Sequence, residues 1–252
     1  CLAWAVRALP SHPEAKKWEM QRRALGDDNW GNWQIEDAAI YNGVWLYSLC
    51  GYAYALEKME ELFKTPEMYY YAQHYLHLMS PAGMIPDFGD ANWLSVWDRY
   101  LVFFEAASSQ YKDPQLKWAA TTIARKFVDF KNPTSIGLGY NFLDCYLWGS
   151  DNIPALPPNS LSEEVIEDVQ GKKIVFRNGW DSGSTYLLLN YRDEGDGGLN
   201  FRDYLRDTIP VEEEKMTHGH SDENSIVLLM SAGSVLLHDA GYRDYMPSGT
   251  FG

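Results

Sequence analysis

The chain has 252 residues, a hydrophobic content of 46% and a formal net charge of −14. This composition is typical of a globular protein with a sizeable core and excludes a disordered chain. The negative charge opposes non-specific binding to nucleic acid or to an anionic membrane, and no apolar run approaches the ~20 residues that span a bilayer. We therefore predict no nucleic-acid partner and no membrane span, and we leave the oligomeric state open.

The first 148 residues carry helical patterns separated by polar loops. Apolar residues recur at helical spacing, and two of the segments open with a capping residue followed by proline. The predicted helices are 33–56, 65–79, 91–109 and 113–130, with loops at 26–33 and 80–93. Helical hairpins that repeat every forty to fifty residues or so are typical of an α/α toroid.

The pattern changes at residues 149–163, where prolines and small polar residues indicate a linker. Strand-like runs follow at 172–178, 184–193, 224–232 and 234–241, and the tetrapeptide SAGS predicts a tight turn between the last two. We therefore predict an α+β fold, with a helical domain at 1–148, a linker at 149–163 and an antiparallel β-sheet domain at 164–252. Both ends of the sequence are abrupt, so we expect a fragment of a longer chain.

Histidines gather in THGHSDENSIVLLMSAGSVLLHDAGY, residues 217–242. His218 and His220 lie two residues apart, so an extended backbone points both to one side, and the following turn returns Asp239 to the level of His220. Two imidazoles and a carboxylate suit Zn²⁺. The alternative is a solvated polar rim at the end of a hairpin.

This stretch resembles the motif that opens the β-sheet domain of heparinase II/III-like polysaccharide lyases. The shared order is HGH, an acidic residue, a serine, an apolar strand, a small turn, a second apolar strand and Asp-x-Gly. The resemblance implies an incomplete α/α toroid followed by the start of an antiparallel β-sandwich. It also implies an acidic, uronate-containing polysaccharide as substrate and a periplasmic or extracellular location. In sequence it is specific only over 217–242.

The resemblance further implies roles for the motif residues. His218 matches a histidine that lines the catalytic cleft, while His220 and Asp239 match two ligands of a structural zinc whose third ligand falls beyond residue 252. This chain departs from the family at His238, where an apolar residue is usual, and at Ala240, where proline is common. We leave His238 without a role.

In the helical domain, the family carries an Asn or His near a helix start and a Glu one turn later. Asn32 and Glu36 match best, with Asn29 and Gln34 as competitors, although Asn32 is an equally good N-cap. Tyr100 is the candidate for the family's catalytic tyrosine, and packing in the core is its alternative. The predicted substrate contacts are Trp33, Gln34, Glu36, Trp93, Arg99 and Arg243.

The resulting hypothesis is a lyase that acts by β-elimination. Asn32 neutralises the substrate carboxylate, Tyr100 or His218 removes the C5 proton, and a tyrosine protonates the glycosidic oxygen. One alternative is a toroidal glycoside hydrolase with a carboxylate pair drawn from Glu36, Asp37, Asp87 and Asp90. The other is a non-catalytic carbohydrate-binding protein, and the net charge of −14 fits an acidic substrate poorly.

Overall fold

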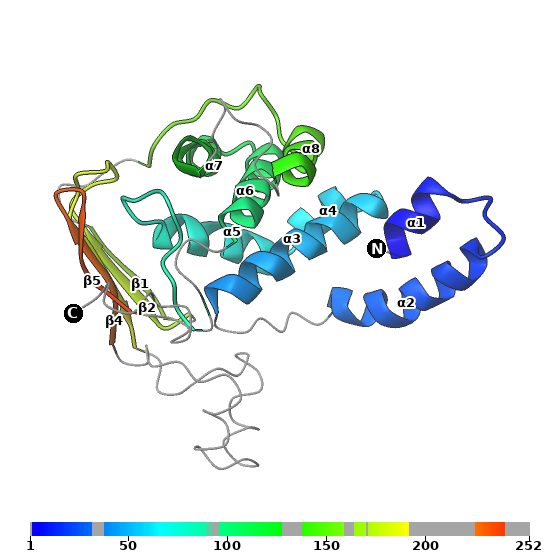
Figure 1. The fold of residues 1–252 in the computed structure, drawn as a ribbon, viewed down its shortest axis with the longest axis horizontal. Coiled ribbons are helices and arrows are strands. Elements are labelled where there is room, and N and C mark those ends of the chain that lie inside the picture. Colours follow the sequence, from blue (N-terminus) through cyan, green and yellow to red (C-terminus); the bar gives the residue numbers. More distant parts are fainter. Residues whose placement is uncertain are drawn as a thin grey trace, which may run out of the picture.

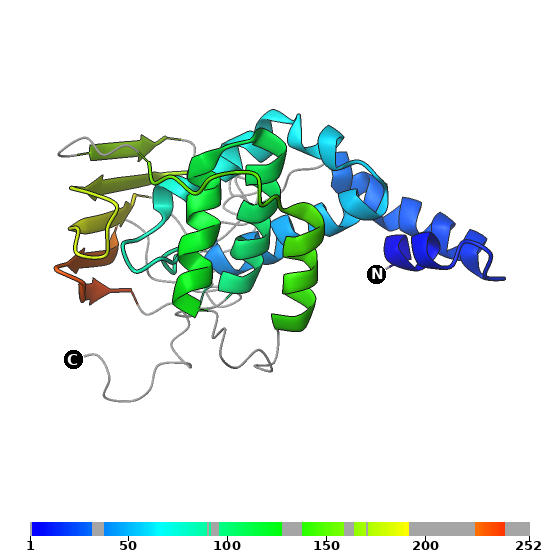
Figure 2. The same cartoon turned by 90° about the horizontal axis from the view of Figure 1, so that it is seen from above.

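The computed structural model describes residues 2–31, 38–89, 91, 96–127, 138–158, 164–169, 171–191 and 225–239. Within these ranges eight helices precede residue 149 and five antiparallel strands follow residue 163, so the predicted mixed α+β class is confirmed. The sheet lies at one end of the molecule, and the helices extend away from it (Figures 1 and 2). The helices are α1 Leu2–Ala8, α2 Ala15–Gly31, α3 Ala39–Ala55, α4 Met59–Phe63, α5 Pro66–Leu78, α6 Trp97–Tyr111, α7 Pro114–Phe127 and α8 Leu138–Trp148.

Two helices begin where the sequence predicts. The Thr65 side chain accepts a hydrogen bond from the backbone N–H of Met68 at the start of α5, which has proline as its first residue. At the start of α7, Asp113 Oδ1 accepts from the backbone N–H of Gln115 at 2.7 Å. Each side chain satisfies a backbone donor that the helix itself leaves without a partner. No helix in the described ranges is long and apolar enough to cross a bilayer.

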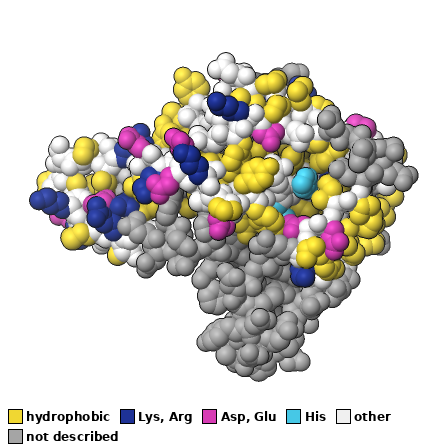
Figure 3. Space-filling view, turned by 180° about the vertical axis from the view of Figure 1, so that it is seen from behind, with side chains coloured by type: hydrophobic (Ala, Val, Ile, Leu, Met, Phe, Trp, Pro, Cys, Tyr) yellow, Lys and Arg dark blue, Asp and Glu magenta, His cyan; other side chains and the backbone are white. Residues whose placement is uncertain are grey.

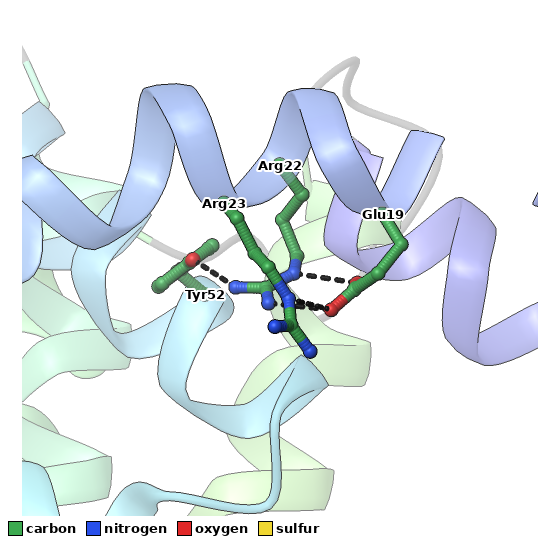
Figure 4. Close-up of polar contacts among 4 residues, drawn as sticks. All are labelled: Glu19, Arg22, Arg23 and Tyr52. Carbon is green, nitrogen blue, oxygen red and sulfur yellow. Dashed lines mark hydrogen bonds and ion pairs between the residues drawn. The ribbon is translucent and has the colours of Figure 1, made fainter. Parts of the chain in front are cut away.

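The predicted loop at 26–33 is wrong over residues 26–31, because α2 continues to Gly31. Packing against α3 explains the difference, since a Cβ atom on Gly26 would lie 2.5 Å from the Tyr52 hydroxyl. Arg22 donates to that hydroxyl and, through two nitrogens, to Glu19 at 2.7 Å (Figure 4). Hydrogen bonds from Arg22 and Arg23 lower the pKa of Glu19 to about 2. Tertiary contacts therefore override a loop-like composition.

The sheet is a meander in which every neighbouring pair is antiparallel, in the order β1-β2-β3-β4-β5. Its strands are β1 Glu164–Asp168, β2 Lys173–Arg177, β3 Tyr186–Asn190, β4 Ser225–Ser231 and β5 Ser234–His238. Ala232 and Gly233 both have positive φ, at 49° and 76°. This is the backbone of a two-residue type I′ turn, so the hairpin predicted at SAGS is confirmed.

The two faces of the sheet differ in burial. Val175, Tyr186 and Leu188 alternate along β2 and β3, are at most 1% exposed and belong to the same core as the helices. The opposite face leaves large apolar side chains in solvent, and yellow side chains cover much of the sheet end in Figure 3. The exposed strand residues on this face include Val165, Phe176 and Leu237, and Val235 and Leu236 of the edge strand β5 are exposed as well.

The end of α5 is bonded to the sheet. The buried Tyr186 hydroxyl donates to the carbonyl of Leu78 at 2.7 Å. Arg177 donates to the carbonyls of Met79, at 3.3 Å, and His77. The guanidinium also packs 3.6 Å from the centre of the Trp180 ring. Because the last carbonyls of a helix have no partner within it, side chains of β2 and β3 act as the C-cap of α5.

Candidate functional site

A buried acid–histidine pair joins the sheet to the helical layer. His238, the last residue of β5, places Nε2 3.4 Å from Oδ2 of Asp87, and both side chains are less than 5% exposed. Asp87 lies in the loop that follows α5. The carbonyl of the next residue, Phe88, accepts from the backbone N–H of Ala39 at 2.9 Å, which fixes this loop to the start of α3. Asp87 is thus held between the start of one helix and the end of one strand.

Asp239 completes this cluster, which we call the junction cluster (Asp87, His238 and Asp239). The backbone N–H of Asp239 donates to the carbonyl of Val227 at 2.8 Å, so the residue continues the β4–β5 ladder. Burial raises the pKa of Asp87, the negative charge of Asp239 raises it further, and His238 acts in the opposite direction. A carboxyl group that keeps its proton above the usual range suits general-acid chemistry.

Tyr100 lies beside this cluster but inside the core. Its side chain is 2% exposed, its hydroxyl donates to the carbonyl of Ala39 at 2.6 Å, and its ring lies 4.8 Å from that of Tyr75. Burial raises the pKa of Tyr100. The hydroxyl is therefore shielded from solvent and already bonded within the chain. This placement agrees with the core alternative for Tyr100, and its catalytic assignment stays a prediction.

Arg99, the neighbour of Tyr100, faces a different direction. Its side chain is 36% exposed, and Nη1 lies 3.4 Å from Oδ1 of Asp98. The other carboxylate oxygen of Asp98 accepts from the amide of Asn141 on α8. Arg99 is thus a partly exposed cation on α6 beside Asp98, and its role as a substrate contact stays a prediction.

No protein-family model, curated protein or solved structure matches this chain. The resemblance to the lyases therefore depends on the motif at residues 217–242. The structure describes residues 225–239 of it, and these form the strand, turn and strand that the motif predicts.

The remaining predicted site residues lie outside the described ranges, so their assignments stay predictions. They are Asn32, Trp33, Gln34, Glu36, Trp93, His218, His220 and Arg243. Asp37 and Asp90, two of the carboxylates considered for a hydrolase, also lie outside them.

The zinc prediction depends on one described ligand. Asp239 lies at the end of β5, where the motif places it. Within the described residues no three His, Cys, Asp or Glu side chains form a group able to bind a metal. The imidazole of His220 and the carboxylate of Asp239 are ligands that Zn²⁺ prefers, so the donor types fit a structural site. The zinc site stays a prediction.

A second buried polar cluster lies where α5 meets the β1–β2 turn, and sequence reasoning did not find it. The Asp168 carboxylate accepts from the Tyr70 hydroxyl at 2.7 Å and from the backbone N–H of Gly171 at 2.8 Å, and it contacts His74 Nδ1 at 2.5 Å. Lys173, fully buried, donates to the carbonyl of Gly171 at 3.1 Å. We call this the α5 cluster.

The protonation states in the α5 cluster follow from burial and hydrogen bonding. Burial lowers the pKa of His74, while its hydrogen bond to Asp168 and the charge of that carboxylate act in the opposite direction. Burial alone would raise the pKa of Asp168, but the hydrogen bond and charge of His74 and the hydrogen bonds from Gly171 and Tyr70 outweigh it and lower the pKa. The polar groups of the cluster hydrogen-bond to one another, which is typical of a cluster that stabilises the fold. His74 and Asp168 lie 94 residues apart, so no local pattern in the sequence predicts their contact.

Proposed function

We propose that this protein is a polysaccharide lyase that cleaves an acidic, uronate-containing polysaccharide by β-elimination. One observation supports it above the others: the hairpin of the lyase-like motif ends at the helical layer, at the junction cluster. Because β4 and β5 are antiparallel, the first residues of β4 lie at the same end of the sheet as His238 and Asp239. Ser225, the first residue of β4, therefore lies at the end of the sheet that faces the loop of Asp87.

The proposed reaction breaks the C5–H and C4–O bonds of the substrate. His218 accepts the C5 proton, the electron pair forms the C4=C5 double bond, and the glycosidic oxygen leaves with a proton from a tyrosine. Asn32 neutralises the carboxylate beside C5, which lowers the cost of removing that proton. We assign no step to Tyr100 in this scheme, since its hydroxyl already donates to the carbonyl of Ala39.

His220 and Asp239 would hold a structural zinc ion that fixes the hairpin. A zinc site of that kind has no open position for substrate, so it supplies stability and no catalytic step. A substrate of this class is met in the periplasm or outside the cell, and we propose that location. The proposed toroid and β-sandwich belong to the same hypothesis.

A glycoside hydrolase is the second candidate, and one observation favours it. Asp87 is buried and its pKa is raised, as in the general acid of a glycosidase. In that case Asp87 protonates the glycosidic oxygen and a second carboxylate activates water or attacks the sugar.

The two reactions give different products. We would incubate the protein with a panel of acidic polysaccharides and follow the ultraviolet absorbance of unsaturated uronate together with new reducing ends. The lyase predicts both signals, and His218→Ala should lower the rate by about 10²–10⁴-fold, the usual contribution of a general base. Tyr100→Phe should keep the absorbance signal, and this variant serves as the matched control.

The outcomes separate the candidates. New reducing ends that form without an absorbance signal would overturn the lyase. If Asp87→Asn also abolishes these reducing ends, the result would support the hydrolase. Binding with neither product would indicate a non-catalytic carbohydrate-binding protein. Equal absorbance rates for wild type and His218→Ala would remove His218 from the reaction.

A further inference from the structure

Three helices bring a polar cluster together around Arg99. We call it the Arg99 cluster, and its members are Tyr47 on α3, Asp98 and Arg99 in the first turn of α6, and Asn141 and Asp144 on α8. Helix α6 packs against both α3 and α8, and the three helices lie next to one another in Figure 1. Arg99 is a predicted substrate contact, so the residues around it bear on how that contact is made.

Asp98 is held from two sides. The amide of Asn141 donates to Asp98 Oδ2, and Arg99 Nη1 lies 3.4 Å from Asp98 Oδ1. Asn141 is 7% exposed, so its amide needs a partner within the fold. The dipole of α6 favours an acid in its first turn, which accounts for Asp98 but not for a buried amide that reaches it from α8. The connected side chains of Asn141, Asp98 and Arg99 therefore fix one end of the guanidinium.

The rest of the guanidinium is open to a ligand. The Arg99 side chain is 36% exposed, and its one hydrogen bond among the described residues uses Nη1. Nε and Nη2 lie on the other edge of the planar group, where two parallel N–H donors match the two oxygens of a carboxylate. An arginine that is already anchored loses less side-chain freedom on binding than a mobile one, so the anchor raises affinity.

The second carboxylate of the cluster has a different partner. The Tyr47 hydroxyl donates to Asp144 Oδ2 at 2.5 Å. Burial raises the pKa of Tyr47, the hydrogen bond to Asp144 raises it further, the charge of Arg99 lowers it and that of Asp98 raises it, so the four side chains lie within electrostatic range of one another. Among the described residues Arg99 has one carboxylate at ion-pair distance, that of Asp98, and it keeps an edge for another.

We propose that Asp98 and Asn141 are positioning residues, which hold Arg99 ready to bind the carboxylate of a uronate. The inference rests on the proposed function, because it takes an acidic polysaccharide as the substrate. Neither residue touches the substrate in this scheme, and each acts through Arg99. The effect of replacing them should therefore appear in the affinity for an acidic sugar and disappear when Arg99 is removed.

Isothermal titration calorimetry of the full chain tests this inference. The acidic probes are tetrasaccharides of alginate, polygalacturonate and hyaluronan, and cellotetraose is the neutral probe. Arg99→Ala should weaken binding of an acidic probe by about 10-fold or more, the usual effect of a hydrogen bond to a charged group. Asn141→Leu should weaken it by about 2–10-fold, the cost of ordering one long side chain, and should add nothing in the Arg99→Ala background. Leu143→Ala is the control on the same helix, because Leu143 is 55% exposed and lies outside the cluster.

Asp98→Ala separates positioning from charge. This variant removes a negative charge beside an anionic ligand, so an effect of charge alone would strengthen binding. Loss of the anchor should instead weaken binding by about 2–10-fold. Asp98 is 23% exposed, so this variant tests the inference even where Asn141→Leu does not fold.

Three results would overturn the inference. The first is a wild-type chain that binds none of the acidic probes at up to about 20 mM, the range of a very weak site. The second is tighter binding by Asp98→Ala. The third is an effect of Asn141→Leu that is the same with and without Arg99, in variants whose circular dichroism matches wild type. The expected binding pattern without any unsaturated product would overturn the lyase and keep the role of Asp98 and Asn141, so the two failures are distinguishable.

Discussion

Tyr186→Phe tests whether the sheet caps α5. The substitution keeps the buried ring and removes only the hydroxyl that donates to the carbonyl of Leu78 at 2.7 Å. That carbonyl belongs to the last residue of α5, so it loses its partner in a site closed to water. Leaving one buried group unsatisfied costs about 1–3 kcal/mol. A loss of about 2 kcal/mol would lower the Tm by about 4–8 °C in a chain of this size.

The assay is urea unfolding followed by circular dichroism, with the free energy of unfolding taken from the linear extrapolation. Tyr146→Phe is the control, because the same atom is removed from a residue that is 83% exposed. We expect the control to change the free energy of unfolding by less than about 0.5 kcal/mol. If both variants unfold at the same urea concentration, Tyr186 does not cap α5.

Three further predictions address other contacts. Gly26→Ala should destabilise the protein by about 1 kcal/mol or more in thermal unfolding, despite the helix propensity of alanine, because the new Cβ displaces the Tyr52 hydroxyl; a higher Tm would contradict this packing. Thr65→Ala should lower the free energy of unfolding by about 1 kcal/mol, and Thr65→Ser should restore most of it; equal losses in both would argue against the cap. The lowered pKa of Asp168 stabilises the fold above the unfolded value of about 4 and loses that effect as the pH falls below it, so the stability difference between wild type and Asp168→Asn should shrink from pH 6 to pH 3. A difference that is constant over this range would show that the charge of Asp168 is not involved.

Local patterns predicted much of the fold. The caps at Thr65 and Asp113 and the SAGS turn each depend on a few neighbouring residues, and each is present as expected. The helical end of the chain and the sheet followed from hydrophobic spacing of 3.6 and 2 residues. The helical extent of α2 could not be predicted in this way, because Gly26 is held by Tyr52, which lies on another helix.

The candidate site was harder to predict, because its contacts join distant parts of the chain. His238 departed from the lyase pattern, and only the fold shows that it meets Asp87. The sequence left the side chain of Tyr100 either to a cleft or to the core, and the structure shows its hydroxyl bonded to the carbonyl of Ala39. Hydrophobic spacing predicts which face of a helix is buried, but it does not identify the partners from distant parts of the chain.

The hydrogen bonds from Arg177 and Tyr186 to the end of α5 determine whether the helices and the strands could be produced as separate fragments. From composition alone, the boundary between the two fragments would be placed in the linker at residues 149–163. A helical piece produced alone would lose the donors that complete α5, while the strands would expose Val175 and Leu188. We therefore expect the two pieces to fold together by fragment complementation, and a chain cleaved between residues 150 and 158 to remain one particle in gel filtration.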